Sequence, residues 1–508
     1  NGVVMAKQAG RLVVVSARAP FVREEAGISR APGGLVSVLL PLMRWSGGTW
    51  IAAGNEQDAL GSGDAGFRVV SASIPTELRA AWYADASTSA LWPLAHGFIE
   101  RCRFRDDATR AYREVNRRIA ELAAAHAPLR GTVWIHDYQL ALVPQFVRAL
   151  RPDLTVGFFW HVPWPSAEFF RALPWRHQLI AGILGANVVG LHVPRYLEAF
   201  DQALRTSGFS YDIEGSELVV QQQNHVCRVV ACPVGIDAAA WSALGQDTDV
   251  QAKARSLRVD LSGSRLLLAV DRFDYVKGIV ERLEAFERLL EGSVDARERA
   301  TFVQIAVPSR DQVPAYRDLR SRVEATVGRI LGRFGTPIRH PVHLFVRSFE
   351  SAELAAFYRA ADVAIVTPLR DGLNLVACEY VATQQLSRGR LLLSEMAGVA
   401  DVLEGAWFVN PYDPDALHAA LSSATLAPET EVDRTRMNRL RQKVFDMSLD
   451  HWTSKFLQHF ERAQQTAFED VPRREGAPRS KSSKSLHLDE GSCQQEPQML
   501  EKLRRHVG

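Results

Sequence analysis

The stretch TPLRDGLNLVACEY, residues 367–380, follows the apolar run VAIV at 363–366 and decides the fold assignment. The apolar run is mostly β-branched and indicates a buried strand, whereas the residues from Leu375 onward have the composition of a helix. Between them lie a cation, a carboxylate and a glycine in consecutive positions, Arg370, Asp371 and Gly372. A polar junction between a buried strand and a helix N-terminus is typical of a ligand site in an α/β fold.

Similar apolar runs recur along the chain and alternate with amphipathic segments rich in Ala, Leu and Arg. A first series lies at 12–16, 132–135, 155–160, 187–191 and 228–234, and a second at 265–270, 301–307, 342–346, 363–366, 390–394 and 406–409. Strands that are apolar throughout and are separated by helices predict parallel sheets covered on both faces. The sequence therefore predicts an α/β fold with two Rossmann-like parallel-sheet domains that face each other across a cleft.

The length of the chain also favours two domains, because 508 residues exceed the size at which a single core stops growing. A boundary near residue 243 separates an N-terminal domain, 11–243, from a C-terminal domain, 244–448. We expect residues 449–469 to form a helix that crosses back to the N-terminal domain. The segment 470–508 is rich in Pro, Ser and charged residues, so we expect it to be disordered.

Composition shows no global bias toward polyanions or membranes. The formal net charge is +2 at pH 7, so any anion binding must come from a local arrangement of cations. No window approaches the ~20 apolar residues of a membrane span, and the N-terminus lacks the pattern of a signal peptide. The five cysteines are scattered without metal-ligand spacing, which is typical of reduced thiols. We expect a cytoplasmic protein with small-molecule substrates, no metal, no cofactor and no nucleic-acid or membrane partner; homo-oligomerisation stays open.

Charged and titratable side chains follow many of the apolar runs. They are Arg18, His136, Asp137, His161, Asp271, Arg272, Asp274, Lys277, Arg310, Arg370 and Asp371. Each one alone is typical of a surface arginine, a structural histidine or a salt bridge, and for Arg370 we expect a structural salt bridge that braces the loop. Ligands of open α/β sheets bind outside the carboxyl ends of the strands. Because charged side chains recur at that edge of the predicted sheets, they together indicate a binding site.

The residue types indicate a sugar nucleotide as the ligand. Arg272 and Lys277, in DRFDYVKG, suit the oxygens of a diphosphate leaving group. Backbone N–H groups after Gly372 and at the Gly33–Gly34 pair add fixed positive dipoles. Asp371 suits sugar hydroxyls and Glu379 lies within reach of a ribose. Arg18 and Arg310 remain for a second anion site, which indicates a phosphorylated acceptor.

The span from Arg11 to about Phe460 resembles the retaining GT-B glycosyltransferases of the trehalose-6-phosphate synthase family. The matching blocks occur in the family's order: VVVSAR, APGGL, TSALWP, VWIHDYQL, GFFWHVPWPS, CPVGID, DRFDYVKGI, QIAVPSRDQV, GRILGRFG, TPLRDGLNLVACEYVATQ, LLLSEMAG and VNPYD. The resemblance implies transfer of glucose from a nucleotide-glucose, with UDP-glucose favoured, to glucose 6-phosphate. The leaving phosphate would take the acceptor proton in a front-face attack, without a protein nucleophile or a metal.

The resemblance also implies roles for individual residues. The donor would be bound by Gly34, His161, Arg272, Lys277, Asp371, Gly372, Leu373, Asn374, Leu375 and Glu379, with His161 at the 6-hydroxyl of the sugar. The acceptor would be bound by Arg18, Tyr83, Asp137 and Arg310, of which Arg18, Tyr83 and Arg310 would hold its phosphate. The residues expected to act in catalysis are Asp137, His161, Arg272 and Lys277.

Three departures from the family pattern keep alternatives open. Ala17 replaces an asparagine, Ala53 replaces a tryptophan that usually lines the acceptor site, and Cys378 replaces a lysine. Because the first two lie on the acceptor side, one alternative is a glucosylglycerol-phosphate synthase that uses ADP-glucose and glycerol 3-phosphate. HVPRY at 192–196 also resembles that relative. Coupling of two cyclitol units and a catalytically silent, regulatory sugar-phosphate-binding paralogue are the others.

Overall fold

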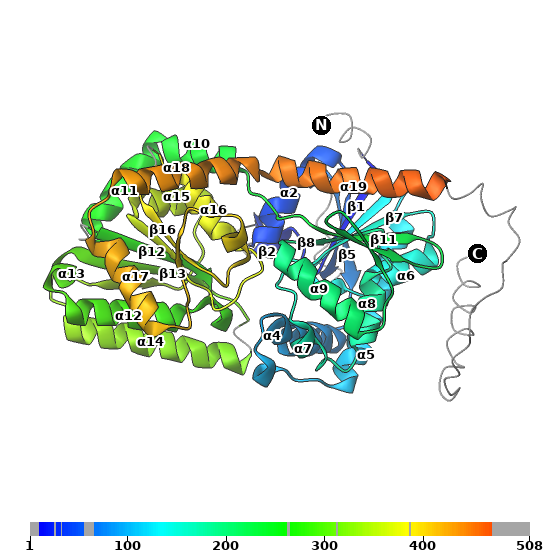
Figure 1. Cartoon of the computed structure of the whole chain (residues 1–508), viewed down its shortest axis with the longest axis horizontal. Coiled ribbons are helices and arrows are strands. Elements are labelled where there is room, and N and C mark those ends of the chain that lie inside the picture. Colours follow the sequence, from blue (N-terminus) through cyan, green and yellow to red (C-terminus); the bar gives the residue numbers. More distant parts are fainter. Residues whose placement is uncertain are drawn as a thin grey trace, which may run out of the picture.

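The computed structural model describes residues 10–24, 27–31, 33–54, 66–261, 265–310, 313–385 and 388–469. The segment predicted to be a disordered tail, 470–508, lies outside them. The described strands form a nine-stranded sheet, a six-stranded sheet and a two-stranded hairpin. The two large sheets lie next to each other along the longest axis of the molecule, each covered by helices (Figure 1). The predicted α/β fold with two parallel-sheet domains is confirmed.

The nine-stranded sheet belongs to the first half of the chain and has the order β5-β4-β1-β6-β7-β8-β11-β10-β9. Its strands are β1 (Leu12–Ser16), β4 (Thr49–Gly54), β5 (Arg68–Ser73), β6 (Thr132–His136), β7 (Thr155–Phe159), β8 (Val188–Leu191), β9 (Asp212–Glu214), β10 (Glu217–Gln221) and β11 (Val226–Ala231). Neighbours from β5 to β11 pair in parallel, whereas β9 and β10 add an antiparallel edge that the sequence did not predict.

The six-stranded sheet is parallel throughout and has the order β14-β13-β12-β15-β16-β17. Its strands are β12 (Arg265–Arg272), β13 (Ala300–Val307), β14 (Val342–Phe345), β15 (Val363–Val366), β16 (Arg390–Ser394) and β17 (Trp407–Val409). Each strand coincides with one apolar run of the second predicted series. The stretch at residues 367–380 therefore leaves the sheet from one of its central strands, β15.

Helices connect the strands and cover both sheets. Those of the first half are α2 (Gly34–Ser46), α3 (Thr76–Ala80), α4 (Trp92–Ala95), α5 (Asp106–His126), α6 (Val143–Leu150), α7 (Ala167–Phe170), α8 (Arg176–Ile183) and α9 (Pro194–Thr206). Those of the second half are α10 (Ala238–Gln246), α11 (Thr248–Asp260), α12 (Ile279–Gly292), α13 (Val294–Arg299), α14 (Pro314–Phe334), α15 (Ser351–Ala360), α16 (Leu375–Thr383), α17 (Pro414–Leu426), α18 (Glu431–Asp446) and α19 (Leu449–Glu469). A π-helical segment, Ala81–Leu91, precedes α4.

The last two helices run along one side of both halves (Figure 1). Helix α18 packs on α16 of the second half, and α19 packs on β7 and β8 of the first. The Phe456 ring of α19 stacks on Trp134 of β6 at 4.7 Å between centroids. Helix α10 packs on α16, with Gly245 against the backbone of Thr383. The domain boundary predicted near residue 243 falls inside α10; because α10 packs on α16, we propose instead that the linker runs through residues 232–237 and that α19 belongs to the N-terminal domain.

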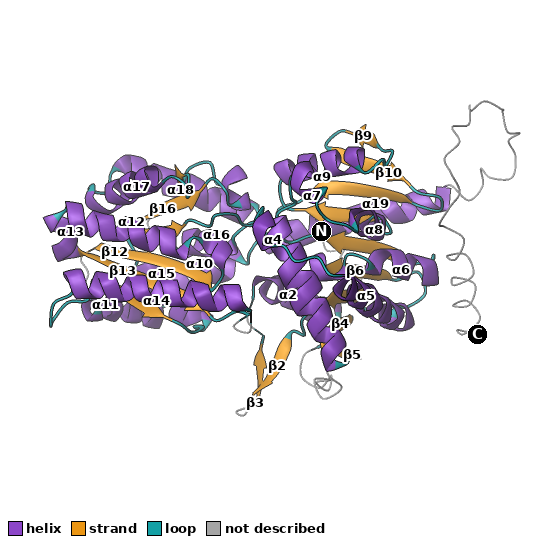
Figure 2. Ribbon diagram, turned by 90° about the horizontal axis from the view of Figure 1, so that it is seen from below, coloured by secondary structure: helices purple, strands orange, loops and turns teal. Residues whose placement is uncertain are grey.

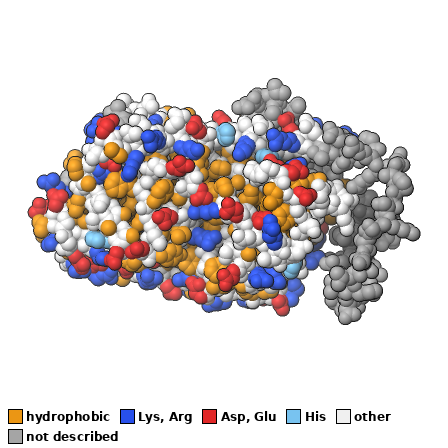
Figure 3. Space-filling model, in the orientation of Figure 1, with side chains coloured by type: hydrophobic (Ala, Val, Ile, Leu, Met, Phe, Trp, Pro, Cys, Tyr) orange, Lys and Arg blue, Asp and Glu red, His pale blue; other side chains and the backbone are white. Residues whose placement is uncertain are grey.

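Two surface features complete the fold. The hairpin of β2 (Phe21–Glu24) and β3 (Gly27–Arg30) projects from the body of the molecule (Figure 2). Acidic and basic side chains are interspersed over the face shown in Figure 3, in line with the small net charge. No described helix is both long enough and apolar enough to cross a membrane.

Candidate active site

The loop after β15 places a carboxylate beside the N-terminus of α16. Asn374 caps this helix in the left-handed region, with φ of 80°, and its side chain accepts a hydrogen bond from the N–H of Ala377 at 3.3 Å. The other N–H groups of a first helical turn have no partner inside the helix, so they form a site for anions. The loop and the helix therefore combine features that a sugar diphosphate requires.

Lys277 forms an ion pair with the loop carboxylate. It follows β12 in a short 3₁₀ turn, and its Nζ lies 2.5 Å from Oδ2 of Asp371. Asn374 donates to the same oxygen at 2.9 Å. Burial alone would raise the pKa of Asp371, but the charge and hydrogen bond of Lys277 lower it below the ordinary value. Asp371 is therefore ionised and forms an ion pair with Lys277.

Two arginines predicted to bind different substrates stack on the same ring. The guanidinium carbons of Arg272 and Arg310 lie 4.9 and 4.1 Å from the centroid of Trp92. The fully buried carboxylate of Asp274 lies 3.7 Å from Nη2 of Arg272 and 3.6 Å from Nη1 of Arg310. Trp92 and Asp274 thus hold two cations next to each other where their mutual repulsion would otherwise separate them.

Arg18 and Tyr83 extend this cationic cluster on the side of the N-terminal domain. Nη2 of Arg18 donates to the Tyr83 hydroxyl at 2.7 Å, and Nε donates to it at 3.1 Å. Burial would raise the pKa of Tyr83, but the charges of Arg18, Arg310 and Arg272 lower it below the ordinary value. The three arginines and the phenol are therefore close enough to act on one another.

Asp137 sits at the carboxyl end of β6 in a strained backbone conformation, with φ of 78°. Its Oδ1 accepts hydrogen bonds from the backbone N–H groups of Tyr138 at 2.9 Å and His161 at 3.4 Å. Among the described residues Oδ2 receives no hydrogen bond, so it is available to a hydroxyl. Burial raises the pKa of Asp137 to about 6, although the two N–H donors oppose this.

Glu379 lies one turn into α16 and has different neighbours. Its Oε2 accepts a hydrogen bond from the Tyr358 hydroxyl at 2.9 Å. Burial raises the pKa of Glu379 to about 7, against the effects of Tyr358 and of the Arg30 charge. Among the described residues, no hydrogen bond or ion pair joins Glu379 to Arg18, Arg272 or Arg310, although Glu379 shares α16 with the predicted donor residue Leu375.

The predicted site residues of the two domains meet across the domain boundary. A Cβ added to Gly372 would lie 2.3 Å from the carbonyl oxygen of His161, and one added to Gly34 would lie 3.2 Å from Cδ1 of Leu375. The Tyr196 hydroxyl also donates to the backbone oxygen of Asp371 at 2.7 Å. The donor loop is thus packed against the N-terminal domain.

The loop cation Arg370 contributes to the same contact. Its Nη2 donates to the backbone oxygen of Trp164 in the N-terminal domain at 3.0 Å. It braces the loop as predicted, but the salt bridge expected for it was wrong, because its partner is a carbonyl. Burial lowers the pKa of Arg370 below its ordinary value.

Sequence reasoning missed one member of the site, Trp92, and named Asp274 without the role that the structure shows for it. Both lie in quoted blocks, TSALWP and DRFDYVKG, but nothing in a sequence shows that a tryptophan and a carboxylate hold two arginines.

Backbone geometry marks the site independently. Four described non-glycine residues have positive φ, and three of them, Asp137, Arg310 and Asn374, are predicted site residues. Such strain concentrates at functional positions.

The acceptor-side substitution Ala53 lies near Arg18. The preceding residue, Ala52 of β4, pairs with Ser16 of β1, so Ala53 and Ala17 follow at the same edge of the sheet. Both alanines are half-buried against the hydrophobic core. Cys378 is buried within α16.

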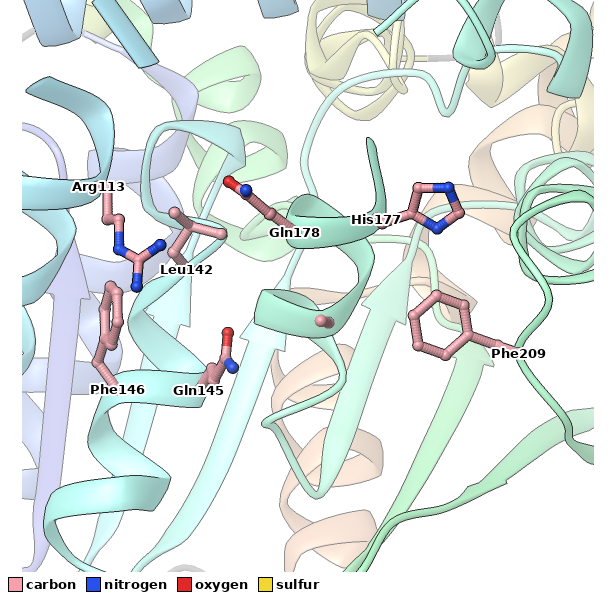
Figure 4. A pocket seen from close by; sticks show the side chains of 8 residues that line it. Arg113, Leu142, Gln145, Phe146, His177, Gln178 and Phe209 are labelled. Carbon is pink, nitrogen blue, oxygen red and sulfur yellow. The ribbon is translucent and has the colours of Figure 1, made fainter. Parts of the chain in front are cut away.

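A pocket of about 330 Å³ lies elsewhere in the N-terminal domain (Figure 4). It is lined by Arg113, Leu142, Gln145, Phe146, His177, Gln178, Ala181 and Phe209, from α5, α6, α8 and the segments beside them. It contains none of the predicted site residues. Within the described ranges, no group of three His, Cys, Asp or Glu residues is arranged to hold a metal ion.

Comparison with known proteins identifies the family. The profile of glycosyltransferase family 20 matches residues 9–462. The chain belongs to glycosyltransferase family 20. A trehalose-6-phosphate synthase of Mycobacterium sp. strain JLS is 41% identical over 461 residues, which cover 88% of this chain and 95% of that protein. The predicted enzyme class, a glycosyltransferase of the trehalose-6-phosphate synthase type, is thereby confirmed.

Solved structures support the family assignment. An α,α-trehalose-phosphate synthase (UDP-forming) from Burkholderia xenovorans in complex with glucose-6-phosphate has a TM-score of 0.82 and 31% identity, covering 89% of this chain and all of that one. An E. coli structure bound with UDP-2-fluoro glucose has a TM-score of 0.81 and 30% identity, covering 89% and 99%. The two parallel-sheet domains of this chain are therefore those of the GT-B synthases.

Proposed function

We propose that this family 20 enzyme is a retaining glucosyltransferase that transfers glucose from UDP-glucose to glucose 6-phosphate and forms trehalose 6-phosphate. The observation that carries the proposal is the pair Arg272 and Arg310 on one Trp92 ring, with Arg18 bonded to Tyr83 beside it. Two adjacent anion sites suit a reaction between a sugar nucleotide and a sugar phosphate. The relatives bound to glucose 6-phosphate and to UDP-2-fluoro glucose support the same two ligand classes.

The donor would lie between the two domains. Arg272, Lys277 and the N–H groups at the start of α16 neutralise the diphosphate, whose charge grows as the glycosidic bond breaks. Asp371, already paired with Lys277 at 2.5 Å, accepts hydrogen bonds from the sugar hydroxyls. The remaining donor contacts are Gly34, His161, Gly372, Leu373, Asn374, Leu375 and Glu379.

The acceptor would lie on the side of the N-terminal domain. Arg18, Tyr83 and Arg310 hold its phosphate, and Oδ2 of Asp137 accepts a hydrogen bond from its reacting hydroxyl. The bond between C1 of glucose and the phosphate oxygen breaks while the acceptor oxygen bonds to C1 on the same face. The acceptor proton passes to the departing phosphate oxygen, so the configuration at C1 is retained.

Product analysis tests the proposal. The enzyme is incubated with UDP-, ADP- or GDP-glucose and with glucose 6-phosphate or glycerol 3-phosphate, and the products are separated and their anomeric configuration determined. We expect trehalose 6-phosphate and UDP as the main products. A folded protein that binds a sugar phosphate but gives no product with any pairing would instead support the silent regulatory paralogue.

One observation favours a second acceptor, glycerol 3-phosphate. The small side chain of Ala53 at the carboxyl edge of β4 offers no aromatic face to a sugar ring. A glucosylglycerol phosphate product formed from ADP-glucose, in preference to trehalose 6-phosphate, would assign the enzyme to that reaction.

A further inference from the structure

Three histidines lie in a row at the carboxyl ends of neighbouring strands. His136 ends β6, His161 follows β7, and His192 follows β8. The ring of His161 lies 5.3 Å from the His136 ring and 5.5 Å from the His192 ring, measured between centroids. Only His161 has a role in the proposed reaction. The other two are buried polar side chains at the edge of the site, and their presence there requires an explanation.

Both neighbours form hydrogen bonds with His161. Nδ1 of His136 lies 3.0 Å from Nε2 of His161. Nε2 of His192 lies 3.1 Å from the backbone oxygen of His161 and therefore donates to it. With the bond from its own N–H to Asp137, His161 is held at its backbone on both sides and at one ring nitrogen. The nitrogen that remains for a substrate is Nδ1.

The contact between the two rings requires a definite arrangement of protons. Burial lowers the pKa of His136 to about 3 and that of His161 well below its ordinary value, so both rings are neutral near pH 7. A neutral imidazole has one N–H donor and one acceptor nitrogen. One ring must therefore donate and the other accept, and the choice fixes the tautomer of both.

The surroundings of His136 determine which ring donates. Its Nε2 is buried and has no hydrogen-bond partner among the described residues. Its ring packs on Trp134, with 4.8 Å between centroids. A buried N–H without an acceptor is rarer than a buried acceptor without a donor. The proton of His136 therefore belongs on Nδ1, where it donates to Nε2 of His161.

We propose that His136 is a positioning residue that holds His161 as the Nδ1–H tautomer, so that His161 donates a hydrogen bond to a hydroxyl oxygen of the donor sugar. The second part rests on the proposed function, because it takes His161 to face the transferred sugar. The close packing of Gly372 on the His161 backbone places this histidine against the donor loop. His192 fixes the backbone from which the ring projects.

The tautomer can be measured directly. In full-length protein labelled with ¹⁵N-histidine and free of substrate, two-bond correlations distinguish protonated from unprotonated ring nitrogens. We expect His161 to show a protonated Nδ1 and an unprotonated Nε2, and His136 to show a protonated Nδ1. A protonated Nε2 on His161 would overturn the proposal. Because no substrate is present, this result does not depend on the proposed reaction.

Substitutions at His136 test the consequence for the reaction. His136→Asn keeps an N–H donor near the position of Nδ1, whereas His136→Leu removes it. We expect His136→Leu to lower kcat about tenfold and to give a mixture of His161 tautomers, and His136→Asn to restore both. A Leu variant with unchanged kcat and an unchanged His161 tautomer would contradict the role of His136.

A donor without the 6-hydroxyl separates this role from a general structural effect. We expect the wild type to discriminate about tenfold against UDP-6-deoxyglucose, and His136→Leu to discriminate much less, because the donor hydrogen bond is already impaired. His225→Leu is the matched control, since the His225 ring donates to the Leu184 carbonyl, at 2.8 Å, outside the site. Equal discrimination in all three proteins would overturn the assignment to the sugar hydroxyl.

Discussion

The proposed donor side and the proposed acceptor side of the site differ in how firmly their charged side chains are held by neighbouring residues. On the donor side, Lys277, Asp371 and Asn374 form one bonded group, and the helix N-terminus behind them is capped. On the proposed acceptor side, the Arg310 side chain is buried against Trp92 and Asp274, whereas Arg18 is exposed and Ala53 is small and half-buried. We infer that the proposed diphosphate site is a fixed part of the fold, whereas the proposed acceptor site has a fixed end at Arg310 and an adjustable end at Arg18 and Ala53.

The largest effect should follow from removing the cations of the donor side. In the double variant Arg272→Ala, Lys277→Ala we expect kcat to fall by about 10³-fold or more, because losing even one group that stabilises charge in a transition state costs about 10²–10³-fold. Steady-state rates with UDP-glucose measure this. Arg288→Ala, which removes a surface ion pair with Asp415, is the control and should retain full activity. A double variant within tenfold of the wild type would contradict the donor assignment.

On the acceptor side, Arg310→Ala should act on binding more than on the chemical step. We expect the KM for glucose 6-phosphate to rise about 10- to 100-fold, the usual effect of losing a hydrogen bond to a charged group. The KM for UDP-glucose should change much less, although Arg272 loses a neighbour on Trp92. If the donor KM rose as much as the acceptor KM, the division into two anion sites would be incorrect.

The substitution Ala53→Trp tests whether position 53 faces the acceptor. A tryptophan would give a sugar ring an aromatic face, worth about 0.5–1.5 kcal/mol, so we expect the KM for glucose 6-phosphate to fall about 2- to 10-fold. Glycerol 3-phosphate has no ring and should gain nothing. Competition between glucose 6-phosphate and glycerol 3-phosphate measures the ratio of kcat/KM for the two acceptors. A shift toward glycerol 3-phosphate would mean that position 53 does not face the acceptor.

Asp137 should give the acceptor side a pH dependence. Since its pKa is raised to about 6, the carboxylate becomes protonated below that pH and no longer accepts a hydrogen bond from the acceptor hydroxyl. We expect kcat/KM for the acceptor to fall as the pH decreases through about 6. Asp137→Asn should have low activity, and its kcat/KM should not fall further as the pH decreases through about 6. A wild-type profile that is flat from pH 5 to 8 would exclude this role.

The smallest effect concerns stability and Glu379. Its pKa is raised from 4.5 to about 7 by burial, so the stability it contributes is present below pH 4.5 and lost as the pH rises through about 7. We expect Glu379→Gln to show a weaker decline in Tm between pH 4.5 and 7 than the wild type. Parallel curves for the two proteins would show that this carboxylate is not buried in solution.

Much of the fold could be predicted because buried parallel strands are apolar throughout. The second series of runs matched all six strands of the second sheet. Four strands of the first sheet, β4, β5, β9 and β10, were missed. RVVSAS of β5 mixes buried and exposed positions, and DIE of β9 is exposed along its length. The buried runs of β4 and β10 are only three residues long, which is too short to predict a strand from the sequence.

Part of the proposed donor site could be named because one motif is local, with Asp371 and the α16 N-terminus within a few positions of each other. The partners of the arginines could not be predicted. Trp92 and Asp274 lie 182 positions apart in the chain, and only the fold brings them to the same cations. The ring contact between His136 and His161 was hidden for the same reason.

The central claim is that a nucleotide diphosphate binds between the start of α16 and the pair Arg272 and Lys277. A crystal structure of the protein with UDP tests it most directly. We predict diphosphate oxygens within hydrogen-bond distance of both side chains and of the first N–H groups of α16. A diphosphate bound away from Arg272 and Lys277 would contradict the account.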